Sequence, residues 1–166
     1  ALEVDMINDV RSLSSSQALE AAVPGHASVV INHMQGDPLS MQNAPHYDDV
    51  VAQVLAYFQE RIAAYVQAGI ARERIWLDPG FGFGKNQVHN YKLLGQLSQF
   101  KSLGCPLLVG LSRKRMIKQV VGENELSLMV GSVSANLLAI HFGASMVRVH
   151  DVAMMRASLN VLQEID

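Results

Sequence analysis

Residues 75–85 read IWLDPGFGFGK, a stretch that joins an apolar run to a carboxylate and a glycine-rich loop. The run is apolar throughout and does not alternate, which is typical of a strand buried on both faces of a parallel sheet. Asp78 closes the run, and Pro79 then opens a loop in which glycine alternates with phenylalanine. The stretch predicts a buried parallel strand that delivers one carboxylate to a flexible, aromatic loop.

Similar apolar runs recur on both sides of this one along the chain. Together the runs cover residues 6–9, 28–34, 74–78, 106–112 and 146–150. Apolar residues at helical spacing separate most of them and predict helices over residues 47–68, 90–103, 113–121, 131–142 and 152–164. Strand and helix alternate five times without a low-complexity linker, so we expect one domain with a parallel sheet and helical crossovers.

Two α/β architectures contain such units: an open doubly wound sheet and a (β/α)₈ TIM barrel. Every apolar run ends in polar residues, namely Asn8, Asp9, His33, Gln35, Asp78, Ser112, Arg113, Lys114, Arg148, His150 and Asp151. In a barrel all carboxyl ends of the strands meet on one face. An open sheet brings together only the ends beside its switch point. The pattern therefore favours the barrel.

Composition excludes several classes of protein. The chain has 166 residues, of which 49% are hydrophobic and 17% charged, with a formal net charge of -2. These proportions are typical of an ordinary soluble domain, and no apolar stretch approaches the roughly 20 residues of a membrane span. The charge argues against nucleic acid as a partner. We expect a cytoplasmic protein in which Cys105 is a small buried filler, and the start at Ala1 suggests a piece of a longer chain.

The glycine-rich loop does not fit the common nucleotide motifs. A GxxxxGK[ST] phosphate loop requires glycine at Pro79, and a GxGxxG motif beginning at Gly80 requires glycine at Lys85. A connection without chemistry is the simple alternative, but two phenylalanines in an exposed turn favour a flat binding partner. The two acceptor oxygens of Asp78 match the paired N–H donors of a guanine-like 2-amino-4-oxo heterocycle.

Several segments resemble the dihydropteroate synthase family. They are NDVRS (8–12), HMQGDPLSMQNAPHYDDV (33–50), DPGFGFGKNQVHN (78–90), GLSRK (110–114) and RVHDV (148–152). The resemblance covers nearly all of the chain in the family's order. It implies a (β/α)₈ TIM barrel of which these runs are strands four to eight. Residues 1–166 are then the C-terminal part of a single pterin-binding domain.

The resemblance also implies a reaction. The family is a transferase of folate biosynthesis that condenses p-aminobenzoate with 6-hydroxymethyl-7,8-dihydropterin diphosphate and releases diphosphate. Mg²⁺ is expected on the diphosphate, with its protein ligand in a missing N-terminal part, so we expect no metal ligand here. We expect the 166-residue portion alone to be inactive. The partners implied are these small molecules, without nucleic acid or membrane, and a homodimer stays open.

The roles of individual residues follow from the same resemblance. The pterin site comprises Asn8, Asp78, Phe83, Lys114, Arg148 and His150. Of these, Lys114 donates to the ring, and Arg148 and His150 lie near the leaving diphosphate, so these three are the expected catalytic residues. The neighbourhood of p-aminobenzoate comprises Ser112, Arg113 and Arg115. His33 lies near the barrel mouth without an assigned role.

Several of these residues also have a simpler interpretation. Asn8 could cap the next segment, Arg113 and Lys114 could form a solvated helix start, and Arg148 could pair with Asp151. The convergence of so many polar groups on one face favours the site.

Several positions depart from the family, among them Lys118, Ser127 and Leu128, and two others bear on substrate specificity. Arg115 stands where the family usually has Ser or Thr, and Asn32 where an apolar residue, often Met, lines the pterin pocket. These departures support an alternative, a non-catalytic pterin-binding paralogue. The other alternative is a pterin-dependent methyltransferase of the same fold. Methyl transfer expels no diphosphate, so Lys114, Arg148 and His150 favour the synthase.

Overall fold

The computed structural model describes residues 3–36, 41 and 45–165, over which parallel strands alternate with helices. The strands are β1 (Met6–Asn8), β2 (Ser28–Asn32), β3 (Ile75–Asp78), β4 (Leu108–Val109) and β5 (Met146–Val147). The helices are α1 (Ser16–Ala22), α2 (Val50–Gln67), α3 (Gln87–Gly95), α4 (Arg115–Val121), α5 (Glu125–His141) and α6 (Val152–Gln163), with 3₁₀ segments η1 (Arg72–Arg74) and η2 (Leu97–Leu103). The predicted strands are all present, which confirms the α/β class.

The strands follow one another across the sheet in chain order. β1, β2 and β3 form one parallel sheet and β4 and β5 another. A parallel bridge between Leu77 and Leu107 joins the two, and the Leu77 N–H donates to the Pro106 carbonyl at 3.0 Å. Over the described residues the order never reverses, so there is no switch point of the doubly wound kind.

Element boundaries differ from the predicted ones where local chemistry intervenes. β4 is two residues long and lies between Pro106, which has no N–H to donate, and a turn at Arg113, which has a φ of 57°. α5 begins at Glu125, earlier than predicted, because the Asn124 side chain caps it by accepting from Ser127 N. α1 has no counterpart among the predicted helices, since its seven residues are too few to show a helical period.

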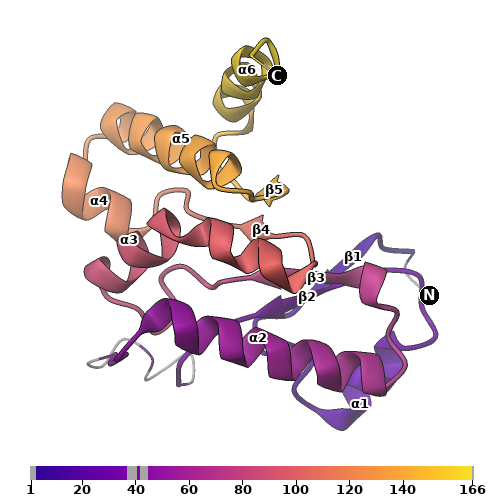
Figure 1. Cartoon of the computed structure of the whole chain (residues 1–166). Coiled ribbons are helices and arrows are strands. Elements are labelled where there is room, and N and C mark those ends of the chain that lie inside the picture. Colours follow the sequence, from indigo (N-terminus) through magenta and orange to yellow (C-terminus); the bar gives the residue numbers. More distant parts are fainter. Residues whose placement is uncertain (1–2, 37–40, 42–44, 166) are drawn as a thin grey trace.

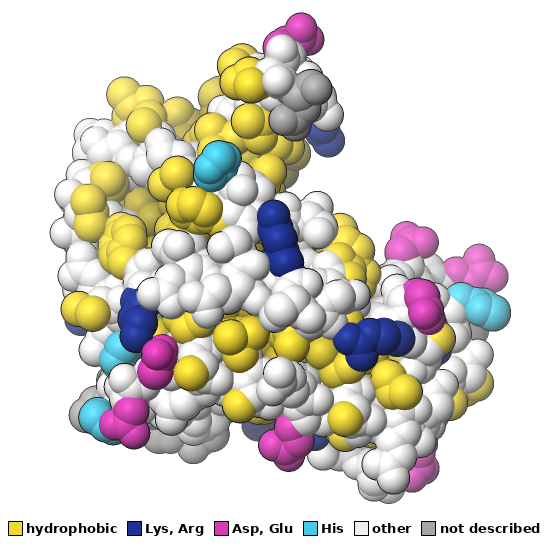
Figure 2. All heavy atoms as spheres, viewed as in Figure 1, with side chains coloured by type: hydrophobic (Ala, Val, Ile, Leu, Met, Phe, Trp, Pro, Cys, Tyr) yellow, Lys and Arg dark blue, Asp and Glu magenta, His cyan; other side chains and the backbone are white. Residues whose placement is uncertain are grey.

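Helices cover one side of the strands. Figure 1 shows α2, α3 and α5 arranged in chain order along the strands, and each helix from α2 to α6 packs against the next. Figure 2 shows exposed hydrophobic side chains over the region of α4 and α5. None of the described helices combines the length and the apolar character that crossing a membrane requires.

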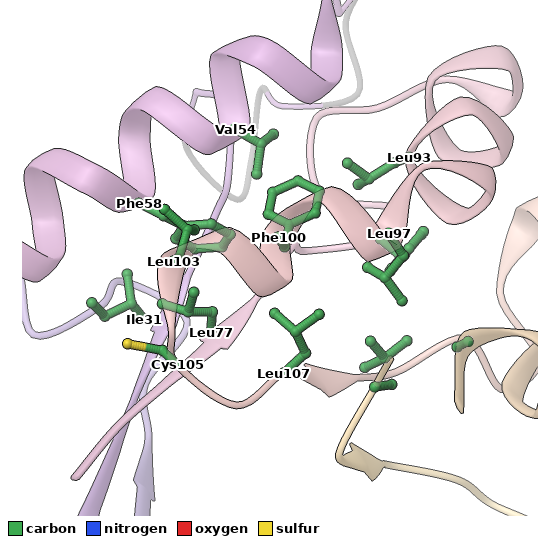
Figure 3. Close-up of a cluster of buried hydrophobic side chains, with 14 of the residues drawn as sticks. Ile31, Val54, Phe58, Leu77, Leu93, Leu97, Phe100, Leu103, Cys105 and Leu107 are labelled. Atoms are coloured by element: carbon green, nitrogen blue, oxygen red, sulfur yellow. The ribbon is translucent and has the colours of Figure 1, made fainter. Parts of the chain in front are cut away.

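The core lies between the strands and the helices that cover them. Phe58 of α2 and Phe100 of η2 are fully buried, with ring centroids 5.9 Å apart in an edge-to-face arrangement. Ile31 of β2 and Leu77 of β3 reach the same cluster from below, as Figure 3 shows. Cys105 is buried beside them, which confirms its prediction as a filler. This packing fixes the carboxyl ends of the strands, where the polar residues lie.

Candidate active site

The ends of the first three strands bring three polar side chains to one side of the sheet. Asn32 is the register partner of Asp78, and Asn8 pairs with Val30, two residues before Asn32. Because side chains alternate along a strand, Asn8, Asn32 and Asp78 all project from the same face. The sheet thus places an acceptor-only carboxylate beside two amides.

Asp78 is a buried carboxylate with both oxygens engaged. It is 1% exposed, its Oδ1 accepts from Gly80 N at 2.8 Å, and its Oδ2 accepts from Arg148 Nη2 at 3.1 Å. The alternative in which Arg148 pairs with Asp151 is therefore wrong. Arg148 reaches Asp78 because it crosses Gly110, where a Cβ would lie 3.0 Å from Arg148 Nη2.

The partner of Asp151 is Arg113. Its Nε and Nη2 donate to the two oxygens of Asp151 at 3.1 and 2.8 Å, and it also pairs with Glu125. A bidentate pair of this kind has fixed geometry. Arg113 thus ties the end of β4 to the start of α6 and is not a solvated helix start.

The aromatic loop differs from the prediction in one respect. Phe81 is fully buried in the core, and only Phe83 is partly exposed. Lys114 Nζ lies 5.0 Å from the centre of the Phe83 ring and donates to the Phe81 carbonyl. Burial lowers the pKa of Lys114 to about 8, although Asp78 opposes this. Lys114 is thus a partly desolvated ammonium held against the loop, and not a solvated helix start.

A second lysine, Lys85, holds the loop from beneath. Its Nζ lies 2.9 Å from His33 Nδ1 and donates to the carbonyls of Gly80 and Phe83 at 3.0 and 3.1 Å. Gly80 has a φ of +68°, and a Cβ there would lie 1.8 Å from the His33 carbonyl oxygen, so only glycine fits. Burial lowers the pKa of Lys85 to about 7. Lys85 is absent from the predicted site because no local pattern indicates that its ammonium folds back under its own loop.

His150 and Ser112 join the ends of β5 and β4. Ser112 is 6% exposed, and its Oγ accepts from His150 N at 3.2 Å and lies 3.0 Å from His150 Nδ1. His150 itself is exposed, so its other ring nitrogen is accessible. Ser112 thus orients His150, and its predicted place near p-aminobenzoate stays a prediction.

Asn8 is not a cap. The side chain of Asp9 caps the following turn, accepting from Arg11 N and Leu13 N at 3.1 Å each. Asn8 Oδ1 instead accepts from Asn32 Nδ2 at 2.9 Å. The two asparagines form a pair beside Asp78.

A polar cleft of about 490 Å³ adjoins Lys114. Its lining includes Gly82 and Lys85 from the loop and Asn90 from α3. Arg115, the first residue of α4, is exposed along the same cleft. The cleft thus presents Lys114 and Arg115 to an anionic or polar ligand, while the buried Lys85 ammonium bonds to the carbonyls of its own loop.

A stability prediction follows from His33. Burial, followed by the charge of Lys85, lowers the pKa of His33 from 6.5 to about 3. The pKa of His33 in the folded state is depressed, so folding favours the neutral ring. The stability that neutral His33 contributes is complete above pH 6.5 and is lost as the pH falls towards 3. We expect His33 to add a slope of up to about 1.4 kcal/mol per pH unit to the unfolding free energy in this range.

Urea unfolding at several pH values between about 7 and 4 measures this slope. His33→Asn retains an acceptor for Lys85 without a titrating ring, so it should lose the added slope. His141→Asn, at an exposed histidine of α5, is the matched control and should retain it. Equal slopes in all three proteins would contradict the prediction.

No metal site is formed by the described part of the chain. Nowhere in it do three His, Cys, Asp or Glu side chains come together in a way that could hold a metal ion. The cationic groups that the described residues bring to the site are lysine and arginine side chains.

The fold and the site together define an α/β protein that presents a buried carboxylate, amides and cationic side chains at the carboxyl ends of parallel strands. This is where such folds bind small ligands. Residues 1–150 match the family described as pterin binding enzyme. The chain belongs to the pterin binding enzyme family.

Similar proteins are dihydropteroate synthases. The dihydropteroate synthase of Escherichia coli strain K12 is 49% identical over 158 residues, which are 95% of this chain and 56% of that protein. The Xanthomonas albilineans enzyme with 4-aminobenzoic acid has a TM-score of 0.89 at 47% identity, over 96% of this chain and 57% of that one. Its complex with 7,8-dihydropteroate has a TM-score of 0.88 at 46% identity, over 96% and 58%. This chain spans little more than half of their length.

Proposed function

We propose that the protein is a dihydropteroate synthase of folate biosynthesis, a transferase that joins p-aminobenzoate to 6-hydroxymethyl-7,8-dihydropterin diphosphate. The observation that carries the proposal is the buried Asp78 carboxylate, which has Asn8 on its own side of the sheet and Arg148 in contact with it. Structures of the Xanthomonas albilineans relative with 4-aminobenzoic acid and with 7,8-dihydropteroate support the proposed second substrate and the proposed product.

In this proposal Asp78 recognises the pterin. Its carboxylate accepts from the ring N–H and the 2-amino group, and Arg148, whose side chain is 46% exposed, shares the carboxylate or moves aside. Phe83 covers the ring face, and the Lys114 ammonium donates to the ring. These contacts orient the exocyclic methylene towards the amine.

The bond changes follow from the pterin's electronic structure. The ring donates electron density to the methylene, so the C–O bond to diphosphate breaks as, or before, the amine of p-aminobenzoate forms the C–N bond. The amine then loses a proton. Arg148 and His150 stabilise the charge of the departing diphosphate, which is the largest charge to develop. Mg²⁺ on the diphosphate stays part of the proposal and has no ligand assigned in this chain.

The architecture proposed for the whole protein is a (β/α)₈ barrel. The five strands would be strands four to eight, and residues 1–166 the C-terminal part of a single pterin-binding domain. Their chain order in the sheet and the agreement with the Xanthomonas albilineans enzyme support this. The cytoplasmic location remains a prediction.

The test is product formation by the purified full-length protein. It is supplied with 6-hydroxymethyl-7,8-dihydropterin diphosphate, p-aminobenzoate and Mg²⁺, and dihydropteroate and diphosphate are measured by chromatography. We expect the two products in equal amounts. Pterin binding by calorimetry without product would favour the non-catalytic paralogue, and methyl transfer from a folate to a corrinoid would favour the methyltransferase.

Arg115 yields a prediction about the second substrate. Its guanidinium borders the cleft beside Lys114, where a fork of two N–H donors suits the p-aminobenzoate carboxylate. We expect Arg115→Ala to raise the KM for p-aminobenzoate about tenfold, the effect of one charge-assisted hydrogen bond. Arg115→Ser should largely preserve kcat.

Steady-state kinetics with each substrate varied in turn measure this effect. The KM for the pterin diphosphate should stay constant, and Arg156→Ala on α6 is the control for a lost surface arginine. An unchanged KM for p-aminobenzoate in Arg115→Ala would show that the side chain only faces solvent.

A homodimer is part of the proposal. Val120 of α4 and Leu126, Val130 and Leu138 of α5 are large apolar side chains that are about half exposed or more. They border an apolar groove between α3, α4 and α5 in the region visible in Figure 2. Exposed apolar surfaces of this kind are frequent at subunit interfaces. Sedimentation equilibrium of the purified protein measures its oligomeric state.

A further inference from the structure

We propose that Asn32 is a specificity-determining residue that fixes the hydrogen-bonding polarity of Asn8. Asn8 then offers an N–H donor to the bound heterocycle beside Asp78. The inference rests on the proposed pterin site and deepens it. Asn32 is 3% exposed and is the last residue of β2.

The first step is that the orientation of the Asn32 amide is determined by a backbone carbonyl. Asn32 Nδ2 lies 2.9 Å from the carbonyl oxygen of Asp9. A carbonyl oxygen can only accept a hydrogen bond, so the amide nitrogen of Asn32, and not its oxygen, faces Asp9. One of the two N–H groups of Asn32 is thereby committed.

The second step transfers this orientation to Asn8. The same Asn32 nitrogen lies 2.9 Å from Asn8 Oδ1, and its remaining N–H is directed there. Asn8 must therefore turn its oxygen towards Asn32. An amide whose oxygen is engaged in this way presents its NH₂ group on the other side, and Asn8 is exposed.

Asn32 is held firmly enough to impose this orientation. Its backbone N–H and carbonyl both bond to the Ser12 hydroxyl at 2.7 Å, and Tyr57 Oη donates to the same carbonyl at 3.1 Å. These bonds fix the backbone from which the Asn32 side chain projects, and turning the buried amide over would cost both hydrogen bonds of its Nδ2. The polarity of Asn8 is thus a property of the folded site before any ligand binds.

The consequence is a donor at Asn8 and acceptors at Asp78 on one face of the sheet. In a 2-amino-4-oxo pyrimidine ring, the ring N–H and the amino group are donors that suit Asp78. The ring nitrogen on the other side of the amino group is an acceptor that suits Asn8. Asn32 therefore selects heterocycles that carry an acceptor next to the amino group.

The test compares a pterin with its 1-deaza analogue, in which a C–H replaces that acceptor nitrogen. Calorimetry with 6-hydroxymethylpterin and 6-hydroxymethyl-1-deazapterin gives the preference of the full-length protein. We expect the parent to prefer the pterin at least about tenfold, the effect of one hydrogen bond. Asn32→Leu leaves the Asn8 amide free to rotate, and the preference should fall to about threefold or less.

Asn32→Asp separates polarity from shape. Above its pKa the aspartate has the shape of asparagine but can only accept, so it loses the bond to the Asp9 carbonyl and draws the NH₂ group of Asn8 towards itself, which turns Asn8 Oδ1 towards the ligand. It should bind the pterin more weakly than Asn32→Leu. A residue that only fills space would give the opposite order, with Asn32→Asp close to the parent.

Repeating the comparison in an Asn8→Ala protein shows whether Asn32 acts through Asn8 or through a general effect on the fold. With Asn8 removed, Asn32→Leu should no longer change the preference, and thermal melting shows which variants are folded. Asn136→Leu, which removes another buried amide, on α5, is the matched control. A tenfold preference retained in Asn32→Leu would overturn the inference and leave the proposed function standing. A parent protein that binds neither compound would overturn the proposed function itself.

Discussion

Asp78→Asn is expected to weaken pterin binding by about 2–5 kcal/mol, roughly 30-fold to several thousand-fold, while the fold stays intact. The amide replaces one acceptor with an N–H donor that faces the ring's own donors. The oxygen of the substituted amide could still accept from Gly80 N, so the start of the loop should survive. Arg148 would lose its anionic partner, which adds to the effect at the site.

Calorimetry with 6-hydroxymethylpterin and thermal melting of the same samples measure this prediction. Asp48→Asn is a matched control, because Asp48 is an exposed carboxylate that contacts only the exposed His46 among the contacts of the described residues. Arg148→Met distinguishes the loss of the carboxylate from the loss of its ion pair. Unchanged pterin affinity together with an unchanged melting curve would defeat the role of Asp78.

Lys114→Met is expected to lower kcat about 10²–10³-fold with a small effect on stability. Removal of one preorganised donor to a reacting centre has effects of this size. Lys114 Nζ contacts the Phe81 carbonyl and the face of Phe83, so it is oriented by the loop before substrate binds. Met retains most of the length and apolar volume of the side chain, so packing against Phe83 should be preserved.

The pH dependence of kcat/KM tests whether the donor is the Lys114 ammonium. The pKa of Lys114 is lowered to about 8, so its ammonium is present below pH 8 and is lost above it. The kcat/KM of the parent, which reports free-enzyme ionisations, should therefore fall as the pH rises through about 8. That fall should be absent in Lys114→Met and present in Lys118→Met, a control on α4 in which the lost lysine pairs with Glu123. A parent profile that stays flat from about pH 7 to about pH 9.5 would exclude Lys114 as the donor.

The class of fold and the position of the site could both be predicted from local patterns. An apolar run such as IWL before Asp78 must be buried on both faces, and helical spacing in 47–68 requires one buried face. These patterns depend only on which residues leave water. Polar residues at the ends of the runs then had to meet, because parallel strands with helical crossovers all point the same way.

The residue that caps the turn after β1 and the buried phenylalanine of the glycine-rich loop were harder to predict, as were the ends of the helices and strands. All of these depend on competing local contacts. Asp9, and not its neighbour Asn8, caps the turn after β1. Phe81 is a core residue although Phe83, two positions later in the same glycine-rich loop, is partly exposed. Neither choice leaves a periodic signal in so short a segment.

The sequence by itself determined that strands and helices alternate, that the carboxyl ends of the strands carry the polar groups, and that Asp78 closes a buried strand beside an aromatic loop. Only the tertiary structure decided how these groups pair: Arg148 with Asp78, Lys85 with His33, and Asn32 with Asn8. The partners are 70, 52 and 24 residues apart, and their contact depends on sheet register and side-chain direction. A shift of one residue in register would send Asn32 to the other face of the sheet, so no local pattern encodes its partner.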